Sequence, residues 1–593
     1  MLREIEIKTD FCVIGGGMAG LCAAIAAARH GTKVVLIHER PVLGGNASSE
    51  MRMWICGAQG RDNRETGILE EIMLENLYRN PTKNHYIFDS ILLDFVKNEP
   101  NITLLLNAAC IGADSENGVF PHGRTVKINS VRAYQMTTQR FYTVKAGIFA
   151  DCSGDSILAP LTGVSYMYGR ESAGEYGEDT VREEPDSLVM GSSCLIQGRE
   201  TGESVAFTPS DNLVPLSEEE AANRPMNIHS TGENFWYLEL GGDTDTIDRA
   251  EETKDELIPL ALAAWDRLKN DPKYNAGNWD LNFLGFLPAK RESRRYKGEY
   301  VLTQKDISSD RVFPDTVAFG GWPLDDHDPA GYRHRGAPNS AIPTPAPYCI
   351  PYRSLYSADA VNLLFAGRNI SVTHLTLSST RVMGTCAVIG QAAGTAASIA
   401  IKGRLTPHEI YLYRIEELRQ TLADDDCFIP YFVRNQSPAA TLEGDYSALC
   451  DGIDRPNRIY GTASCGLEIE NGVRVEYKLP QEIGEIEVHV VFDSDLCRDT
   501  LPGDAMERSH ITRANVPLNA PQMRMPLTLC REFTLTAVRE DGQTETLARV
   551  ENNRKRSYHF KLSGRYQNVS LCVISNWGGT EKTRVFSFDV KIS

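Results

Sequence analysis

The sequence predicts an α/β fold that is interrupted by an inserted α+β segment and followed by a separate all-β region. Three observations lead to this prediction. A strand, a glycine-rich turn, a helix and a second strand follow one another within residues 9–39. A strand and a long apolar helix return much later, within residues 361–403. After residue 435, short strands of alternating apolar and polar residues replace this pattern.

The N-terminal segment has the order of a βαβ unit. Residues 10–14 form a short apolar strand, residues 21–28 are strong helix formers, and residues 33–37 form a second apolar strand. The turn before the helix fits G-x-G-x-x-G, through Gly15, Gly17 and Gly20. The first glycine permits a tight turn, the second admits a pyrophosphate, and the third lets helix and strand pack closely. The free N–H groups at the helix start attract phosphates.

An acidic residue ends the second strand. Glu39 lies about 20 residues beyond the last glycine, where a carboxylate accepts hydrogen bonds from the hydroxyls of a ribose. This position favours an adenosine with a free 2′-hydroxyl, and therefore FAD or NAD rather than NADP. No second glycine motif in a strand–turn–helix context occurs between residues 100 and 300. We therefore expect no built-in NAD(P)H domain and a separate electron acceptor.

The later elements follow in a consistent order. Residues 101–106 predict a strand, and residues 126–150 predict two or three antiparallel strands. Residues 166–345 are richer in glycine, proline, aromatic and charged residues, with one helix near residues 258–269. A strand at 361–365 precedes a long helix from about Arg381 to Lys402. The C-terminal strands predict an antiparallel β-sandwich, and they cover residues 473–477, 486–491, 532–536, 568–572 and 585–590.

Composition excludes several classes of partner. The 593 residues carry a formal net charge of −18, which repels nucleic acids and anionic membranes. No apolar run approaches the ~18 residues that span a bilayer, and the first residues contain no apolar signal segment. The 14 cysteines include no C-x-x-C pair, and we expect no metal site. These features predict a soluble, cytoplasmic protein, and they leave its oligomeric state open.

Four segments resemble the signatures of two-dinucleotide-binding flavoproteins with the glutathione-reductase-type FAD fold. Residues 39–45 resemble the E-x-x-x-x-G-G extension, and residues 150–155 resemble the second signature, usually written A-T-G-D. Residues 362–368 resemble the late strand whose glycine contacts the flavin end, and residues 378–394 resemble the closing helix. Ser153 and Cys152 depart from the second signature, but Ser153 keeps a hydroxyl group.

The whole chain is most similar to a bacterial family of FAD-dependent oxidoreductases whose members are often labelled xanthan lyases. Residues 291–295, 320–327 and 350–355 add to this resemblance. It implies FAD as cofactor and a closing helix whose N-terminus faces the flavin pyrimidine ring. The implied cofactor-binding residues are Gly15, Gly17, Met18, Ala19, Gly20, Glu39, Arg40, Gly45, Asn46, Ser153, Gly154, Asp155, Gly367 and Arg368.

Two residues near the closing helix are candidates for catalysis. His374 lies between the late strand and that helix, and its imidazole could take a hydroxyl proton at neutral pH. Alternatively, His374 satisfies loop carbonyls. Arg381 opens the predicted helix, where a cation is unfavourable unless an anion is bound. Arg381 therefore binds the reduced flavin or a substrate carboxylate, or it forms a structural salt bridge.

A second candidate segment is the loop that contains Asp326 and His327. It follows Trp322 and offers carboxylates for hydroxyl groups and an aromatic face for a sugar ring. A solvated loop is the alternative. Trp236, Tyr237 and Glu239 fit a half-buried strand slightly better than a pocket. Arg291, Arg294 and Arg295 fit a salt-bridged face, and the alternative is that one of them binds a carboxylate through two hydrogen bonds.

The predicted organisation has five segments. Residues 1–165 and 346–403 form an FAD-binding Rossmann-like domain, residues 166–345 a substrate domain, residues 404–435 a helical connection, and residues 436–593 the β-sandwich. We expect an FAD-dependent oxidoreductase that transfers a hydride between flavin and a small polar, carbohydrate-like substrate, such as a sugar or sugar acid. The alternatives are a non-catalytic carbohydrate-binding protein on a flavoprotein scaffold, an NAD-dependent dehydrogenase and, with least support, a polysaccharide lyase.

Overall fold

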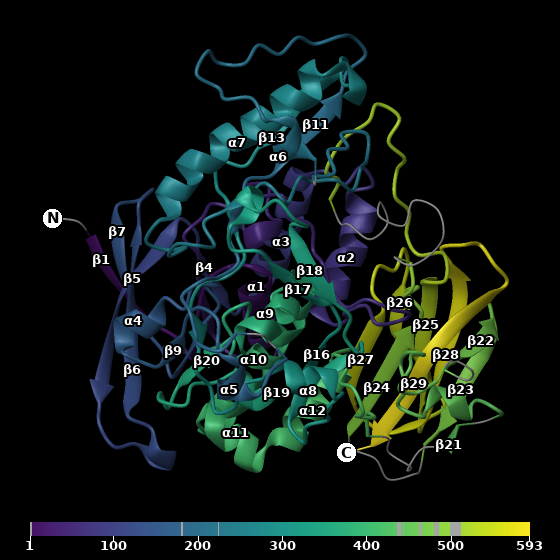
Figure 1. The fold of residues 1–593 in the computed structure, drawn as a ribbon. Coiled ribbons are helices and arrows are strands. Elements are labelled where there is room, and N and C mark those ends of the chain that lie inside the picture. Colours follow the sequence, from purple (N-terminus) through teal and green to yellow (C-terminus); the bar gives the residue numbers. More distant parts are fainter. Residues whose placement is uncertain are drawn as a thin grey trace. The chain divides into compact units, whose positions relative to one another are not determined.

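The computed structural model describes residues 3–179, 182–222, 224–435, 441–442, 444–461, 465–479, 485–498 and 512–592 (Figure 1). The chain divides into two compact units. The first comprises Met1–Gln59, Thr82–Leu418 and His510–Gln522, and the second comprises Gly60–Pro81, Arg419–Ser509 and Met523–Ser593. The predicted Rossmann-like and substrate segments thus fall in one unit, except that Gly60–Pro81 belongs to the C-terminal unit. The sequence did not predict that residues 60–81 belong to the second unit, because local patterns do not contain long-range contacts.

A five-stranded parallel sheet forms the centre of the first unit. Its strands, in spatial order, are β20 (Leu363–Phe365), β8 (Ile148–Asp151), β2 (Phe11–Ile14), β3 (Val34–Ile37) and β4 (Ile102–Leu105). The middle strands are completely buried, as expected for a parallel sheet covered on both faces. The late strand β20 lies beside β8, so residues from both ends of this unit meet at one sheet edge.

Two helices pack closely on one another beside the opening glycine turn. These are α1 (Met18–Arg29) and α10 (Met383–Gly403). A Cβ atom on Gly390 would lie 2.1 Å from the carbonyl oxygen of Ala19, and one on Gly394 would lie 2.1 Å from that of Ala23. The two backbones therefore approach as closely as only glycine permits. Because α10 is fixed against α1, Gly367 and Gly390 both lie next to Ala19, within the opening glycine motif.

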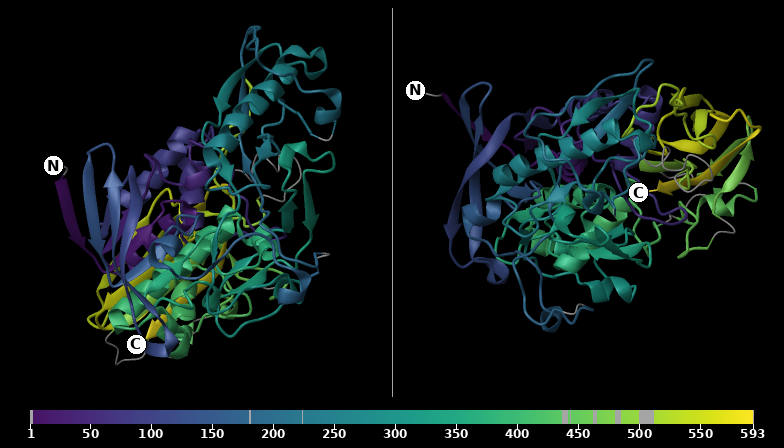
Figure 2. Two further views of the ribbon diagram at one scale, coloured as in Figure 1. Left: turned by 60° about the vertical axis from the view of Figure 1, so that its left-hand side comes forward. Right: turned by 45° about the horizontal axis from the view of Figure 1, so that its top comes forward.

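A second sheet flanks the parallel one. Its strands, in spatial order, are β1 (Arg3–Lys8), β7 (Arg140–Lys145), β6 (Val126–Gln135) and β5 (Ala108–Asn117). Figure 2 shows the purple strand β1 running along the blue strands of this sheet. Strand β1 pairs with β7 in parallel, and the other pairs are antiparallel.

The segment between β8 and β20 contains short strand pairs and one long helix. The pairs that matter for the site are β10 (Ser192–Ser193) with β12 (Glu239–Leu240) and β14 (Ala289–Lys290), and β17 (Leu324–His327) with β18 (Asn339–Ile342). The other strands are β9 (Tyr166–Met167), β11 (Ile196–Glu200), β13 (Trp279–Leu284), β15 (Arg295–Tyr296), β16 (Thr316–Gly320) and β19 (Tyr348–Pro351). The longer helices near them are α7 (Ala250–Asn270) and α9 (His374–Thr380). The shorter ones are α4 (Leu158–Thr162), α5 (Ala173–Tyr176), α6 (Glu218–Ala221) and α8 (Gln304–Ser308).

The second unit is built around two antiparallel sheets. One is ordered β21 (Thr441–Leu442), β23 (Arg474–Lys478), β28 (Tyr566–Asn576), β25 (Cys530–Arg539) and β26 (Thr544–Val550). The other is ordered β22 (Leu467–Glu470), β29 (Lys582–Ile592), β24 (Glu485–Phe492) and β27 (Ser557–Ser563). Buried residues from both sheets, including Val475, Val488 and Phe533, belong to one apolar cluster. The alternating pattern in the sequence reflects this shared core.

Several helices differ from their predicted extent. The helix α2 (Ile68–Arg79) and the helix α3 (His85–Lys97) were not predicted. The helix α7 begins eight residues before its predicted start and continues through Pro259. Further along the chain, α11 (Pro407–Tyr413) and α12 (Ile415–Asp424) account for the predicted helical connection. Among the described residues, only α10 is long and apolar enough to cross a bilayer, and 94% of its apolar stretch is buried inside the protein.

Candidate functional site

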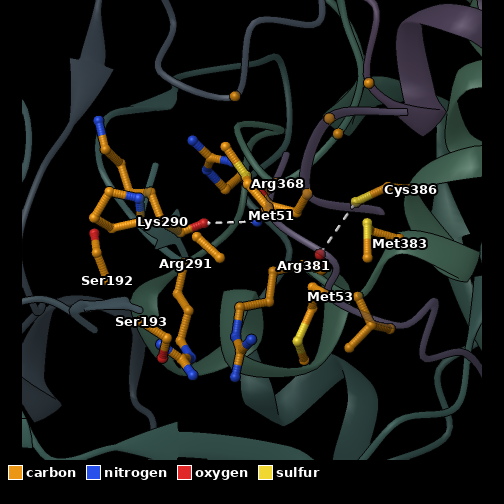
Figure 3. Close-up of a pocket in the computed structure, with 18 of the residues that line it drawn as sticks. Met51, Met53, Ser192, Ser193, Lys290, Arg291, Arg368, Arg381, Met383 and Cys386 are labelled. Atoms are coloured by element: carbon orange, nitrogen blue, oxygen red, sulfur yellow. Dashed lines mark hydrogen bonds between the residues drawn. The ribbon is translucent and has the colours of Figure 1, made fainter. Parts of the chain in front are cut away.

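A cavity of about 700 Å³ opens in the first unit where α1 and α10 begin. Figure 3 shows side chains from both halves of this unit, such as Met51 and Arg368, around it. Every residue predicted to bind the cofactor lines this cavity except Gly20. Such a volume, with a few polar groups on an apolar wall, is typical of a site for a small molecule.

The three glycines of the opening turn differ in what surrounds them. A Cβ atom on Gly15 would lie 2.3 Å from the carbonyl oxygen of Cys152, and one on Gly20 would lie 1.8 Å from that of Gly15. The fold itself therefore requires these two glycines. A Cβ atom on Gly17 would meet only the Cα of Gly45, at 3.9 Å, and the backbone of Gly17 has an ordinary φ of −66°. Nothing in the protein excludes a side chain there, but a phosphate lying on the turn would.

The end of β3 carries an ionised carboxylate at the cavity wall. Glu39 lies 3.4 Å from His38 Nδ1 and 3.5 Å from Arg40 Nε. Burial raises the pKa of Glu39, but the neighbouring His38 and the charge of Arg40 outweigh burial and lower this pKa to about 2. The ring of His38 also accepts a hydrogen bond from the Gly16 N–H at 3.0 Å. This contact holds the glycine turn against the end of the strand.

A second ionised carboxylate, Asp155, joins the two halves of the first unit. Its Oδ1 accepts hydrogen bonds from Arg368 at 2.8 Å and Ser293 at 2.7 Å, and its Oδ2 accepts one from Lys290 at 2.9 Å. Burial raises the pKa of Asp155, but Arg368 and Lys290 hold it well below its usual range. Asn46 donates to the carbonyl oxygen of Lys290 at 3.1 Å, a contact drawn in Figure 3. These bonds fix a part of the cavity wall that both halves of the first unit contribute.

His327 lines the cavity and is oriented by two carboxylates. Its Nδ1 lies 2.7 Å from Glu239 Oε2, and its Nε2 lies 3.4 Å from Asp325 Oδ2. The short contact assigns the proton to Nδ1, and the long one leaves Nε2 weakly engaged. Trp236 packs edge-on against the imidazole, with ring centroids 5.1 Å apart. A histidine held in this tautomer can accept a proton at Nε2.

Arg381 also lines the cavity, but not as the first residue of the closing helix. It is the C-terminal cap of α9, and α10 begins at Met383. A cation is favourable at a helix C-terminus, so the predicted conflict with the helix dipole does not exist. Arg381 donates to the backbone oxygen and to Oδ2 of Asp325 at 3.1 and 3.2 Å. The N-terminal turn of α10, with Val382, Met383 and Cys386, faces the cavity directly.

His374 lies elsewhere, and its surroundings do not suit the role of a base. Its Nδ1 lies 2.9 Å from Glu292 Oε2, and its Nε2 lies 3.1 Å from Asp326 Oδ1. Burial lowers the pKa of His374, but the two carboxylates outweigh burial and raise it to about 10. His374 is therefore a buried cation at neutral pH with no free nitrogen. Neither His374 nor Asp326 belongs to the cavity lining.

Three residues of the site stand out only in the structure. Lys290 and Arg291 come from β14 and the residue after it, and Glu239 lies behind the lining where it holds His327. Their signal in the sequence is weak, because charged residues in a strand are normally solvent-exposed. Burial of Arg291 and Glu239, both less than a tenth exposed, is what distinguishes them. Among the described residues, no group of three or more His, Cys, Asp or Glu residues is placed to hold a metal ion.

The glycine turn, the ionised carboxylate of Glu39 and the helix N-terminus at one cavity are the features of a dinucleotide-binding protein. Residues 10–422 match the sequence model of a family described as FAD dependent oxidoreductase, which is more than half of the chain. The protein therefore belongs to this family of FAD-dependent oxidoreductases, and FAD, not NAD, is its cofactor. The open space above Gly17 and the donors around Asp155 fit that cofactor.

Other likenesses are partial. One stretch of 44 residues is 43% identical to an iron-sulfur protein of the CoB–CoM heterodisulfide reductase of Methanopyrus kandleri, and covers 7% of each protein, so the chain spans far less than two thirds of that relative. Among solved structures, a myxobacterial chondrochloren halogenase is 12% identical with a TM-score of 0.33, over 71% of this chain and 80% of that one. The adenylylsulfate reductase of Archaeoglobus fulgidus is 12% identical with a TM-score of 0.29, over 71% and 74%. The family 32 carbohydrate-binding module of Streptococcus pneumoniae EndoD is 14% identical with a TM-score of 0.18, over 27% and 99%.

Proposed function

We propose that the protein transfers a hydride between a small polar, carbohydrate-like substrate and FAD, and that His327 exchanges the accompanying proton. One observation carries this proposal: His327, oriented by Glu239, lines the same cavity as the glycine turn and the N-terminus of α10. A proton-accepting group and a redox cofactor at one cavity are what alcohol oxidation requires.

The chain's own residues supply a complete set of cofactor contacts. Gly17 and the first turn of α1 would hold the pyrophosphate, and Glu39 would accept hydrogen bonds from the adenosine ribose. Asp155 would bind the sugar alcohol that links the phosphates to the flavin, and the N-terminus of α10 would stabilise negative charge on the ring. When bound, FAD accepts a hydride from a substrate carbon. This arrangement corresponds to the Rossmann-like, glutathione-reductase-type domain that we propose for the first unit.

In this proposal His327 accepts the hydroxyl proton of the substrate. Removal of a hydride from a hydroxyl-bearing carbon requires that the hydroxyl proton leave as well. Nε2 of His327 accepts this proton, because its Nδ1 already donates to Glu239 at 2.7 Å. Glu239 is a positioning residue that holds the tautomer and stabilises the resulting imidazolium. It is ionised for this role: burial raises its pKa, but Arg291, His327 and Arg381 together lower that pKa below the usual value.

The lining around His327 supports a hydroxylated substrate. Trp236 and Trp322 offer aromatic surface, and Asn339 and Asp325 offer hydrogen-bonding groups. Aromatic rings with adjacent polar groups suit the apolar faces and hydroxyl groups of a sugar. We further propose that the second unit is a β-sandwich, that the electron acceptor is a separate molecule, and that the protein works in the cytoplasm.

The His327→Gln and His327→Ala variants test the proposed base. The substrate is first chosen in an anaerobic screen of sugars, sugar acids and cyclitols, as the compound that bleaches the wild-type flavin fastest. We expect both variants to retain FAD. We expect this substrate to reduce their flavin about 10²- to 10⁴-fold more slowly than that of the wild type. The measurement is stopped-flow absorbance of the flavin. The control is His334→Gln, which changes a histidine whose side chain is 40% exposed. Reduction of both His327 variants at the wild-type rate would remove His327 from the mechanism.

A further inference from the structure

Two buried arginines of the cavity carry more hydrogen-bond donors than the protein satisfies. Arg291 donates from Nη2 to the carbonyl oxygen of Trp236 at 3.0 Å and pairs through Nη1 with Glu239 at 3.1 Å. Arg381 donates only from Nη2, to Asp325. Arg291 Nη1 and Arg381 Nε make no hydrogen bond of good geometry within the described part of the chain. Each guanidinium has five N–H donors, so these two atoms leave donors for another acceptor.

Most of the nearest acceptors are already engaged, and Glu239 Oε1 is the exception among the described residues around the two arginines. Asp325 Oδ2 accepts hydrogen bonds from Arg381 at 3.2 Å and from Trp322 at 3.3 Å. Its Oδ1 accepts from Asn339. Glu239 Oε2 is shared by His327 and Arg291. In this corner of the cavity, two donor atoms without a partner, Arg291 Nη1 and Arg381 Nε, thus stand against one such acceptor, Glu239 Oε1. Donors are in excess, so a complementary ligand brings acceptors.

The two guanidinium groups are close enough to repel one another. Burial lowers the pKa of Arg291, Glu239 raises it again, and the positive charge of Arg381 lowers it further. Figure 3 shows both side chains extending in the same direction from their backbones. Two like charges held together in a buried position are stabilised by an anion between them.

We propose that Arg291 and Arg381 bind a carboxylate group of the substrate, so that the substrate is a hydroxylated carboxylic acid rather than a neutral sugar. This inference rests on the proposed function and specifies its substrate class. A carboxylate matches the planar donors of arginine and adds a single negative charge. A phosphate would add up to two negative charges beside Asp325 and Glu239, so it fits the site less well.

The test measures binding to the flavin-loaded protein by calorimetry, with the perturbation of the flavin spectrum as a second signal. The probes are lactate, malonate and gluconate, each compared with its neutral counterpart lactamide, malonamide or glucose. We expect at least one acid to bind ten times more tightly than its neutral counterpart. Arg291→Gln and Arg381→Gln should each weaken binding of that acid at least tenfold while binding of the neutral compound stays within twofold.

Matched variants separate this role from a structural one. Arg291→Lys and Arg381→Lys keep the charge but lose the planar pair of donors, and we expect intermediate losses. Lys305→Gln is the control, because Lys305 pairs with Asp179 on the surface and does not line the cavity. The ratio of flavin to protein absorbance must stay unchanged in every variant, which shows that the cofactor site is intact.

Three results would overturn the inference: no acid binds, acids and neutral counterparts bind equally, or tight binding of an acid survives both arginine-to-glutamine changes. Tighter binding of inorganic phosphate than of every carboxylate, lost in the same variants, would also overturn it in favour of a phosphorylated substrate. Failure of the proposed function is distinguishable, because an acid would then bind through both arginines without any hydroxylated acid reducing the flavin.

Discussion

Replacing Gly17 by alanine is expected to give a folded protein that binds FAD at least 10-fold more weakly. The protein leaves room for the added methyl group, whose nearest neighbour would be the Cα of Gly45 at 3.9 Å. The methyl group would occupy the space into which the pyrophosphate must come, and such overpacking costs about 1–3 kcal/mol. The measurement is the Kd for FAD of the apoprotein, together with its urea unfolding curve without FAD.

Two further glycine variants complete this experiment. Gly20→Ala should destabilise the apoprotein itself, because the added Cβ would lie 1.8 Å from the carbonyl oxygen of Gly15. Gly174→Ala is the neutral control, since no atom lies within 4 Å of the added Cβ. If Gly17→Ala bound FAD as well as the wild type, the phosphates would not lie on this turn.

Replacing His374 by alanine is expected to destabilise the first unit by about 3 kcal/mol rather than to slow catalysis selectively. The change leaves Asp326 without its imidazolium and leaves Glu292 with Arg295, at 3.6 Å, as its remaining ion-pair partner. Removing one member of a buried cluster of ion pairs lowers the stability of the fold, because the remaining charges stay buried without their partner. The measurement is the free energy of unfolding in urea, and His334→Ala is the exposed control.

The same cluster predicts how stability depends on pH. The pKa of His374 is raised from 6.5 to about 10 in the folded protein, so folding binds a proton. The contribution of the charged His374 to the free energy of unfolding is complete below pH 6.5 and is lost as the pH rises through about 10. We expect the unfolding free energy to fall over this range in the wild type and to fall less in a Glu292→Gln/His374→Gln variant. An identical pH dependence in both proteins would contradict this account.

The sequence predicted the parts of the fold that depend on local patterns. The strand, glycine turn and helix at the N-terminus have short-range causes, since each follows from the residues within it. The helix α3 could have been found in the same way, because Phe88, Ile91, Leu92 and Val96 are buried at helical spacing. The start of α7 was misplaced because Pro259, which normally ends a helix, lies within it.

The catalytic candidates depend on contacts that no local pattern contains. His374 and His327 are both single histidines in polar segments, and nothing in either segment separates them. They differ in their partners. Glu292 and Asp326 engage both nitrogens of His374. Glu239 engages Nδ1 of His327 closely, whereas Asp325 lies 3.4 Å from its Nε2. Similarly, Arg381 was interpreted as opening a helix that begins two residues later.

By itself, the amino-acid sequence determined the dinucleotide turn, the preference for a ribose with a free hydroxyl, and the return of a late strand and helix. Those properties depend on the backbone conformations that glycine permits and on the spacing of residues along the chain, and both are local features of the sequence. Only the tertiary structure decided which histidine lines the cavity and which arginines keep donors without a partner. Protonation and hydrogen-bond capacity depend on burial and on charges that are distant in the chain but close in space, so they exist only after folding.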